Sequence, residues 1–453
     1  MSGTAMVVGL DGVPHWLLRK LADDGVLPET AALLPQGTLR PLSAPVPDIS
    51  STSWASFLTG TDPGTHGVYG FIDLVPGEYR TYFPQFPDLR AEPLWHAVDR
   101  SVVVNVPGTY PAPRMDGLLV SGFVAPDFGR AVYPPEWGDR LRSRGYELDV
   151  EVGDVAADPF GFLDRVDAVL SARRAAFREL LGAVDWRLAV CVITETDRVH
   201  HFLWRDLMDP ASPLHQRILE FYTRVDAAVA ELAERAGDGA LMIVSDHGFG
   251  PAGTQFYLNS WLREAGYLAL PADAASLEDL DAGTAAFALD PGRLYLNDAS
   301  RYPRGRSLSA GERRNLLDEL TARVLALRVG EDGTVTEGGP GLPVAEEVLD
   351  GVELYSGPCV AAAPDLVVMP AADVQIRGAW NQPGLTAASP LTGTHTRTDA
   401  TFWCRGDQGE GGVHMRDVAP TVLASMGLDP LPGMEGTDVR GRIPALDGGR
   451  SHD

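Results

Sequence analysis

Short apolar runs that end in polar residues alternate along the chain with segments of helical periodicity. The run AMVVGLDGV predicts a buried strand ending at Asp11, and the spacing of the next apolar residues predicts a helix from about Pro14 to Asp24. SVVVNVPG and GLLVSGF predict two more strands, and a helical pattern from about Phe160 to Val184 leads into a strand in WRLAVCVITETD. A second long helix, beginning near HQRILEFY, leads into a strand in ALMIVSDHGFG. Strand and helix therefore alternate.

This alternation continues to the end of the chain, where PDLVVMP and ATFWC predict strands and MRDVAPTVLASMGL predicts a helix that stops at Gly427. The pattern is typical of an α/β fold with a mostly parallel sheet between helical layers. It loosens in a stretch rich in Pro, Gly and Asp, which we interpret as an inserted cap containing helices near 259–265 and 310–327. We therefore expect an α/β core of residues 1–254 and 365–440, a cap of residues 255–364, and a C-terminal tail of residues 441–453.

The composition limits what the protein can bind. Hydrophobic residues make up 45% and charged residues 22% of the 453 residues, which is typical of a globular chain. The net charge of −25 argues against a nucleic-acid polymer or an anionic membrane surface as the main ligand, because both are bound through Lys and Arg. A small anion remains possible if metal ions supply the positive charge at its site.

The three cysteines are far apart and form no disulfide framework, and no apolar run approaches the ~20 residues of a membrane span. The N-terminal segment also lacks the basic region of a signal peptide. We therefore expect a cytoplasmic protein with no membrane association. The oligomeric state stays open.

Three aspartates follow predicted strands directly: Asp11, Asp197 and Asp246. The carboxyl ends of parallel strands meet at one edge of a sheet, where α/β proteins bind their ligands, so these side chains are expected to converge. Any single one could instead cap the following helix.

Histidines accompany these aspartates. His247 follows Asp246 directly, His201 lies four residues after Asp197 and hence on the same face of a helix, and His395 lies in the Gly/Thr-rich loop TGTHTRTD. Asp and His are ligands that suit zinc, which takes about four of them, so the set predicts two zinc sites, with manganese as the alternative. Asp11, Asp246, His247 and a hydroxyl oxygen form one site, and Asp197, His201 and His395 form the other, with one position open.

His200 competes with His201 as a ligand, because it lies on a similar face one residue earlier. We interpret it as a solvent-facing or core-edge histidine.

A cluster of hydroxyl residues, Ser50 to Ser53, opens the predicted helix in PDISSTSWASFLTGTDPGTHGVYGF. Such a cluster caps a helix, because a side-chain oxygen satisfies free amides of the first turn. A hydroxyl at a helix N-terminus is also well placed to act on a bound phosphate. The local pattern leaves both interpretations open.

In order and spacing, Asp11 and the segments TGTDPGTHG, TDRVHH, SDHGFG and GTH resemble the alkaline phosphatase superfamily. Most of the chain resembles its type I phosphodiesterase/nucleotide pyrophosphatase branch, and PLWHAVDRSVVVNVPGTYP, LNSWLREAGYL, APDLVVMP and DVAPTVLASMGL add to this resemblance. The resemblance implies an alkaline-phosphatase-like mixed sheet between helical layers, an inserted cap, and a site with two zinc ions. Counting back from Thr59-Gly60 to the position of the family's nucleophile gives Ser50, which would also be a metal ligand. Ser51 to Ser53 then serve as capping or supporting residues, and Ser56 packs.

The implied activity is the cleavage of a phosphodiester or pyrophosphate bond of a small molecule through a phosphoserine intermediate. A phosphatase, a phosphonate hydrolase or a non-catalytic metal-binding relative are the alternatives. Two positions depart from the family pattern: many members use threonine where Ser50 stands, and the pyrophosphatases have an asparagine near Phe71 that contacts phosphate. Arg198 and Arg397 neighbour ligand positions and are expected either to grip phosphate oxygens or to form surface ion pairs.

Other hydrolase classes lack their motifs here. A formylglycine sulfatase would need Pro and Arg where this chain has Thr52 and Trp54. Neither the GxSxG of serine hydrolases nor the GxxxxGK[ST] of P-loop enzymes occurs.

Overall fold

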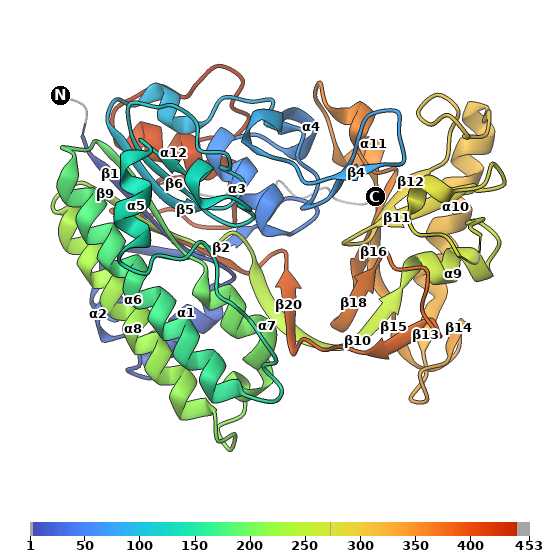
Figure 1. Ribbon diagram of the computed structural model, residues 1–453, viewed down its shortest axis with the longest axis horizontal. Coiled ribbons are helices and arrows are strands. Elements are labelled where there is room, and N and C mark those ends of the chain that lie inside the picture. The colour runs from blue at the N-terminus through green and yellow to red at the C-terminus, as the bar shows by residue number, and fades with distance from the viewer. Residues whose placement is uncertain (1–2, 272, 442–453) are drawn as a thin grey trace, which may run out of the picture.

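The computed structural model describes residues 3–271 and 273–441, and its largest element is a nine-stranded mixed sheet (Figure 1). The strand order is β22-β2-β21-β9-β1-β8-β5-β6-β7. Strands β9, β1, β8, β5 and β6 are parallel, whereas β21 and β7 run antiparallel to their neighbours in this set. The strands are β1 (Ala5–Leu10), β2 (Gly37–Ser43), β5 (Ser101–Val106), β6 (Gly117–Ser121), β7 (Val132–Tyr133), β8 (Leu188–Ile193), β9 (Ala240–Val244), β21 (Ala400–Arg405) and β22 (Val413–His414).

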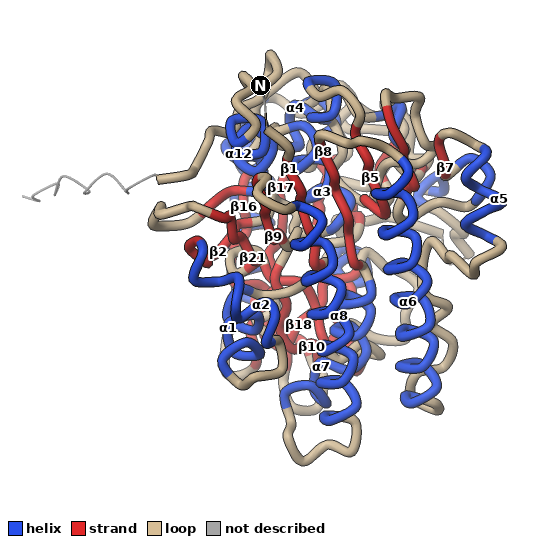
Figure 2. Tube along the Cα trace, turned by 90° about the vertical axis from the view of Figure 1, so that its left-hand side faces the viewer, coloured by secondary structure: helices blue, strands red, loops and turns tan. Residues whose placement is uncertain are grey.

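Helices cover both faces of this sheet. On one face lie α1 (His15–Asp23), α2 (Pro28–Leu33), α5 (Glu136–Arg142), α6 (Pro159–Ala183), α7 (Glu195–Met208) and α8 (His215–Ala236). On the other lie α3 (Ser50–Thr59) and α12 (Val418–Ser425), with α4 (Pro63–His66) next to α3. Helices α6 and α8 run side by side along their face (Figure 2). The alkaline-phosphatase-like arrangement of a mixed sheet between helical layers is therefore present.

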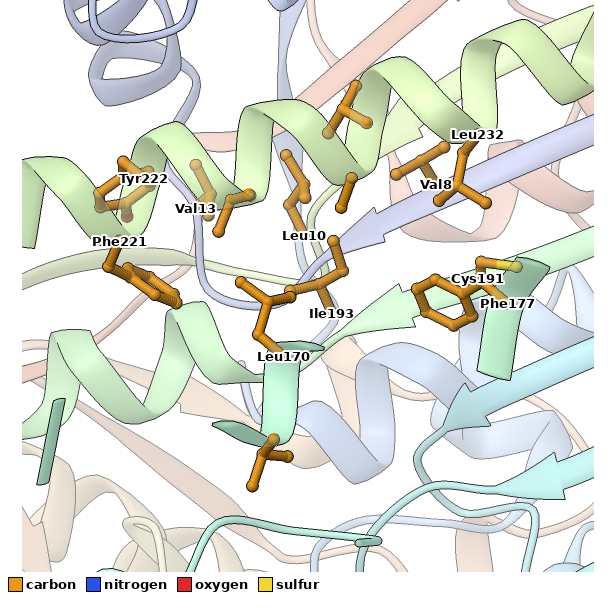
Figure 3. Close-up of a cluster of buried hydrophobic side chains, with 14 of the residues drawn as sticks. Val8, Leu10, Val13, Leu170, Phe177, Cys191, Ile193, Phe221, Tyr222 and Leu232 are labelled. Atoms are coloured by element: carbon orange, nitrogen blue, oxygen red, sulfur yellow. The ribbon is translucent and has the colours of Figure 1, made fainter. Parts of the chain in front are cut away.

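Alternating side chains of the central strands supply the two halves of the core. Val8 and Leu10 of β1 pack toward α6 and α8, together with Ile193 of β8 (Figure 3). Val7 points to the opposite face and packs with Trp54 of α3. Successive side chains of a strand face opposite sides, so a continuous apolar run is what a strand covered on both faces requires.

The remaining strands form a second body with its own hydrophobic core, beside the large sheet (Figure 1). One sheet contains β10 (Gly248–Tyr257), β18 (Asp373–Arg377), β19 (Thr386–Ala388) and β20 (Gly393–Thr396), and another contains β11 (Ala286–Leu289), β12 (Arg293–Leu296), β16 (Ala345–Asp350) and β17 (Leu366–Pro370). Smaller elements are β13 (Leu327–Val329), β14 (Val335–Glu337), β15 (Leu342–Pro343), α9 (Leu258–Glu264), α10 (Ala310–Ala326), α11 (Gly351–Leu354), and the β3 (Asp73–Leu74) and β4 (Thr81–Tyr82) hairpin.

This second body continues past the expected end of the cap at residue 364. Strand β17, expected in the core, pairs with β12 and β16, and β18 pairs with β10. An apolar strand can be buried by either sheet, and only its long-range partners decide which one. We therefore propose a cap that extends to β19, before the chain returns to the large sheet at β21.

Short 3-10 helices occupy Leu34–Gln36, Phe86–Asp88, Leu94–Ala97, Phe128–Arg130, Leu277–Asp279, Val360–Ala362 and Met415–Asp417. Apart from Gly441, the expected tail of residues 441–453 lies outside the described residues. Within residues 3–271 and 273–441, no helix is both long enough and apolar enough to span a bilayer.

Candidate metal centre and active site

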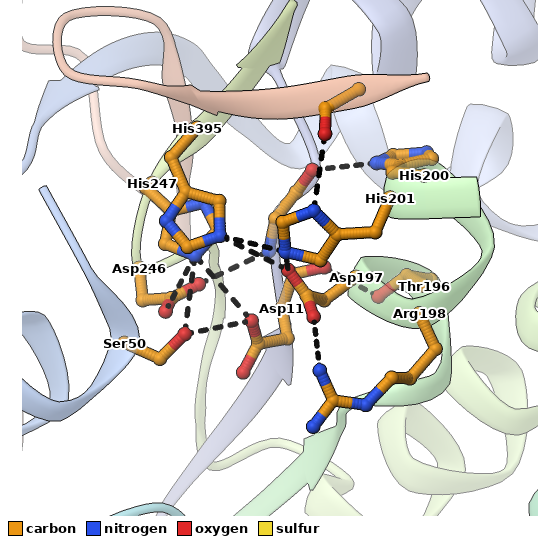
Figure 4. A network of polar contacts seen from close by, with 12 residues as sticks. Asp11, Ser50, Thr196, Asp197, Arg198, His200, His201, Asp246, His247 and His395 are labelled. Atoms are coloured by element: carbon orange, nitrogen blue, oxygen red, sulfur yellow. Dashed lines mark hydrogen bonds and ion pairs between the residues drawn. The ribbon is translucent and has the colours of Figure 1, made fainter. Parts of the chain in front are cut away.

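The three aspartates that follow strands converge at the carboxyl edge of the large sheet (Figure 4). Register explains why: Leu10 at the end of β1 pairs with Ile193 at the end of β8, and the preceding Gly9 pairs with Val244 at the end of β9. The polar residues that follow each strand therefore emerge side by side. Asp11, Asp197 and Asp246 are all buried there.

A glycine turn fixes two of these carboxylates. Gly12 has a φ of +68° and turns the chain directly after Asp11, and its amide donates to Asp246 Oδ1 at 3.1 Å. An added Cβ at Gly12 would lie 3.0 Å from the ring of Phe249, which is tighter than ordinary contact, and the positive φ would strain any residue that carries a side chain.

Ser50 is the first residue of α3, and its hydroxyl faces this edge (Figure 4). Ser50 Oγ lies 3.2 Å from His247 Nε2 and 3.5 Å from Asp11 Oδ1. One turn further on, Trp54 Nε1 donates to Asp11 Oδ2 at 3.1 Å. Sequence reasoning missed this contact, although the spacing of four residues from Ser50 places Trp54 on the same helix face.

The other hydroxyls of the cluster do not cap the helix. The N-cap residue is Ile49, with no side-chain capping bond. The hydroxyls of Ser51, Thr52 and Ser53 are buried and have no hydrogen-bond partner among the described residues. Ser56 packs in the interior, where its hydroxyl lies 3.0 Å from His66 Nε2.

The donor atoms form two adjoining groups. In the first, His247 Nε2 lies 3.3 Å from Asp246 Oδ2 and 3.7 Å from Asp11 Oδ1. In the second, Asp197 Oδ1 lies 3.2 Å from His201 Nε2 and 3.4 Å from His395 Nε2. The stacked rings of His247 and His395, with centroids 3.5 Å apart, join the two groups. All seven residues expected as ligands thus come together.

His395 reaches the site by strand pairing. It lies in β20, and not in a loop as the sequence suggested, opposite Phe249 of β10 in an antiparallel ladder. Since β10 begins directly after His247, the pairing brings the two histidines to one place.

Backbone contacts orient the three histidine rings. Each Nδ1 lies against a carbonyl oxygen: His201 with Gly393 at 3.1 Å, His247 with Gly248 at 3.0 Å, and His395 with Asp48 at 2.9 Å. A carbonyl only accepts, so Nδ1 carries a proton in each ring, and Nε2 points toward the carboxylates, where it could bind a metal ion.

Two metal ions would separate and neutralise these closely spaced donor atoms. The Nε2 atoms of His201 and His395 are 3.0 Å apart, and the buried oxygens Asp197 Oδ1 and Asp246 Oδ2 have no hydrogen-bond partner among the described residues. Nitrogen and oxygen donors in this number suit zinc or manganese. The residues therefore fit two metal ions.

The carboxyl groups of the site have strongly shifted pKa values. Burial, together with the charges of Asp246 and Asp197, raises the pKa of Asp11 well above its usual value. Burial and the Asp197 charge also raise the pKa of Asp246 to about 6, although the Gly12 amide opposes this. Burial works against ionisation of Asp197 too, but His201, His395 and Arg198 hold its pKa well below the usual value. Bound cations would favour the ionised carboxylates.

His200 is turned away from this cluster. Its Nδ1 lies 2.8 Å from the carbonyl oxygen of Gly12, and its Nε2 contacts the hydroxyl of Tyr222. The side chain is fully buried, so it is neither solvent-facing nor at the core edge, and burial lowers its pKa to about 4.

Arg198 is held by carboxylates. Asp149 accepts from Nε at 2.9 Å and from Nη2 at 2.6 Å, and Asp197 Oδ2 accepts from Nη1 at 3.0 Å. The guanidinium also lies over the ring of Phe123, 4.6 Å from its centroid. Arg397 forms an ion pair with Glu347, 3.7 Å away.

A pocket of about 690 Å³ opens beside the cluster. The large-sheet body contributes Phe71, His201 and residues next to Ser50, and the second body contributes Met369 and Trp380. Phe71 packs against Phe123, with ring centroids 5.7 Å apart. Local sequence signals did not identify Met369 or Trp380, because they reach the pocket only through the position of the second body.

The mixed sheet and the Asp/His cluster at its edge define a hydrolase of the alkaline phosphatase superfamily. The chain belongs to the type I phosphodiesterase / nucleotide pyrophosphatase family, which matches residues 5–409. It is accordingly a hydrolase of phosphoester bonds, in a family that depends on two metal ions.

Solved structures show the same fold. Phosphonoacetate hydrolase from Sinorhizobium meliloti 1021, in complex with phosphonoformate, is 16% identical, with 94% of this chain and 96% of that chain covered and a TM-score of 0.62. Human ectonucleotide pyrophosphatase / phosphodiesterase 5 is 12% identical, with 97% of this chain and 100% of that chain covered and a TM-score of 0.57. Among curated proteins, none matched this chain.

Proposed function

We propose that this protein cleaves a phosphodiester or pyrophosphate bond of a small molecule, with Ser50 as the nucleophile. The observation that supports this most strongly is the position of Ser50 Oγ at a helix start, 3.5 Å from Asp11 Oδ1 and 3.2 Å from His247 Nε2. A nucleophilic serine needs a partner that favours loss of its proton, and the donor group beside it is such a partner once a metal is bound.

The proposed cofactors are two zinc ions, with manganese as the alternative. Asp11, Ser50, Asp246 and His247 would hold one ion, and Asp197, His201 and His395 the other. When bound, the ions would lower the pKa of the serine hydroxyl and balance the charge on the phosphoryl oxygens.

Ser50 carries the covalent step. Its oxygen forms a bond to phosphorus as the bond to the leaving oxygen breaks, and the serine proton is released. The N-terminal end of α3 directs its positive dipole toward the phosphoryl group. Water then attacks phosphorus, the bond between Ser50 Oγ and phosphorus breaks, and the phosphate product leaves while a proton from the water restores the serine hydroxyl.

The pocket favours a diester over a simple monoester. Its volume of about 690 Å³ leaves room for a second substituent on phosphorus. The extra charge of a monoester would find little compensation beyond the metals, because carboxylates hold Arg198 and Glu347 pairs with Arg397.

A phosphonate hydrolase is the second candidate function. The structural similarity to phosphonoacetate hydrolase, which extends over 94% of this chain, favours it. A phosphatase acting on monoesters would use the same donor groups.

We also propose a reducing compartment such as the cytoplasm for the protein, because Cys191, Cys359 and Cys404 are all unpaired. The charge of −25 supports a small phosphorylated substrate in place of a nucleic acid or a membrane surface.

The test compares p-nitrophenyl phosphate, bis-p-nitrophenyl phosphate and phosphonoacetate on protein loaded with zinc or manganese. We expect the diester to have the highest kcat/KM. A monoester preference of more than about tenfold, ~1.4 kcal/mol of differential transition-state binding, would overturn the diester assignment. Release of phosphate from phosphonoacetate alone would establish the second candidate.

A further inference from the structure

The pocket beside the metal centre is suited to a particular kind of organic group. It opens next to His201 and His395 and next to Asp48 and Ile49, which directly precede Ser50. A group bonded to a phosphorus atom at Ser50 would therefore enter it. The volume of about 690 Å³ matches pockets that enclose a ligand of drug size.

Apolar side chains make up most of its wall. Ile49, Phe71 and Ile72 contribute from the N-terminal part of the chain, and Leu289, Met369 and Ile376 contribute from the second body. Each methylene that a ligand buries against such a wall leaves water, which makes the free energy of binding more favourable. Substrates with more apolar surface should therefore bind this pocket more tightly.

The charged side chains of the wall oppose an anion. Arg377 is the only arginine or lysine among the described residues of the lining, and its guanidinium pairs with Asp290 at 3.1 Å. Asp48 and Glu278 also line the pocket. Carboxylates thus outnumber guanidinium groups, so a negatively charged substituent would meet repulsion without a free cation to balance it.

Two cations outside the lining are also paired with carboxylates. Lys20, the only lysine, pairs with Asp24 on α1 at 2.6 Å. Arg198 is held by Asp149 and Asp197, and its side chain is outside the lining.

We propose that the pocket selects phosphoesters whose second organic group is uncharged and mainly apolar, an alkyl or aryl group, and rejects groups that carry a carboxylate or further phosphates. The proposal rests on the proposed function, since it assumes that phosphorus binds at Ser50. It separates this chain from its structural neighbour, because phosphonoacetate carries a carboxylate.

The first experiment measures kcat/KM on the metal-loaded protein for p-nitrophenyl phosphodiesters with a common leaving group. The second substituent is methyl, butyl, hexyl, phenyl, 4-carboxyphenyl or 4-(trimethylammonio)phenyl. We expect a rise of about two- to fourfold per added methylene, and a 4-carboxyphenyl ester at least about tenfold poorer than the phenyl ester. No dependence on chain length, or a preference for either charged ester, would overturn the proposal.

A variant that adds a cation to the pocket wall tests whether the lack of a free cation causes the discrimination against anions. The side chain of Ile72 lines the pocket and is 37% exposed. Ile72→Lys should reduce the discrimination against the 4-carboxyphenyl ester by about threefold or more, because it supplies the missing cation. Ile72→Met, the matched control, should leave the discrimination unchanged, and an equal effect of both variants would contradict the charge argument.

A binding measurement separates this inference from the proposed function. Calorimetry of methyl-, butyl- and hexylphosphonate with the metal-loaded protein should show affinity that rises with chain length. If no ester is hydrolysed but this rise is seen, the pocket inference stands and the proposed function fails. If the affinities are equal, the pocket inference fails whatever the turnover.

Discussion

Arg198 donates through Nη1 to Asp197 Oδ2 at 3.0 Å, while Asp149 accepts from its Nε and Nη2. Asp197 is the carboxylate whose other oxygen faces His201 and His395. The arginine therefore holds a proposed metal ligand in place, and its other contacts are to a carboxylate and an aromatic ring. We therefore propose that Arg198 is a positioning residue of the proposed metal centre.

We accordingly expect Arg198→Ala to lower kcat by about 10- to 100-fold with little change in KM, because groups that orient metal ligands act at this level. Steady-state kinetics and metal content at equal protein concentration check this. Asp149→Asn should shift kcat in the same direction by a smaller factor. Arg397→Ala, which removes an ion pair with Glu347, serves as the control and should change neither parameter. A large rise in KM for Arg198→Ala would instead indicate direct contact with substrate.

Ser50→Ala should abolish turnover, by about 10³-fold or more, because the nucleophile is lost. Metal binding should fall little, since Asp11, Asp246 and His247 remain. Ser53→Ala is the matched control: its hydroxyl lies on the same helix, is buried and has no partner among the described residues. Thermal melts would show that both variants fold. Loss of activity in Ser53→Ala alone would move the nucleophile to another position.

Protein purified without chelator should contain close to two equivalents of zinc or manganese by elemental analysis. His201→Ala should lose about one equivalent, because its Nε2 belongs to the second donor group. His200→Ala should retain both, although removing its buried hydrogen bonds should cost about 1–3 kcal/mol of unfolding free energy. Loss of a metal from His200→Ala with retention in His201→Ala would contradict the assignment.

His66 should make the fold sensitive to acid. Burial lowers the pKa of this histidine from 6.5 to about 3, so it stays neutral in the folded protein. Between these values the unfolded chain binds a proton that the folded chain does not, and stability falls as the pH falls through this window. The loss from this group should reach about 2 kcal/mol at pH 5 relative to pH 8.

Urea unfolding of the wild type and of His66→Gln at pH 8 and pH 5 checks this. Glutamine can still contact the hydroxyl of Ser56, the partner of His66 at 3.0 Å, but it does not titrate. The wild type should lose more free energy of unfolding between pH 8 and pH 5 than the variant. The metal centre contributes to the loss in both proteins, so the difference between them reports on His66. Equal losses would show that His66 does not control acid stability.

The sequence by itself determined the strands and helices that carry the site. The expected helix of residues 160–184 is α6 (Pro159–Ala183), and the expected strand before Asp11 is β1 (Ala5–Leu10). These elements are readable because the period of apolar residues directly reflects which side of each element is buried. The sheet edge also follows, since Asp11, Asp197 and Asp246 come shortly after the ends of β1, β8 and β9. The spacing of Asp197 and His201 is likewise local, one turn of a single helix.

Only the tertiary structure decided which elements meet. It paired β17 with β12 and β16, extended the second body past residue 364, and placed His395 in a strand against β10. It also assigned Arg198 to Asp149 and Asp197, and left the hydroxyls after Ser50 without a capping role. These features depend on contacts between residues far apart in the chain, and a local pattern of apolar and polar residues carries no information about its distant partners. For the same reason the pocket, whose walls come from two bodies, appears only in the folded chain.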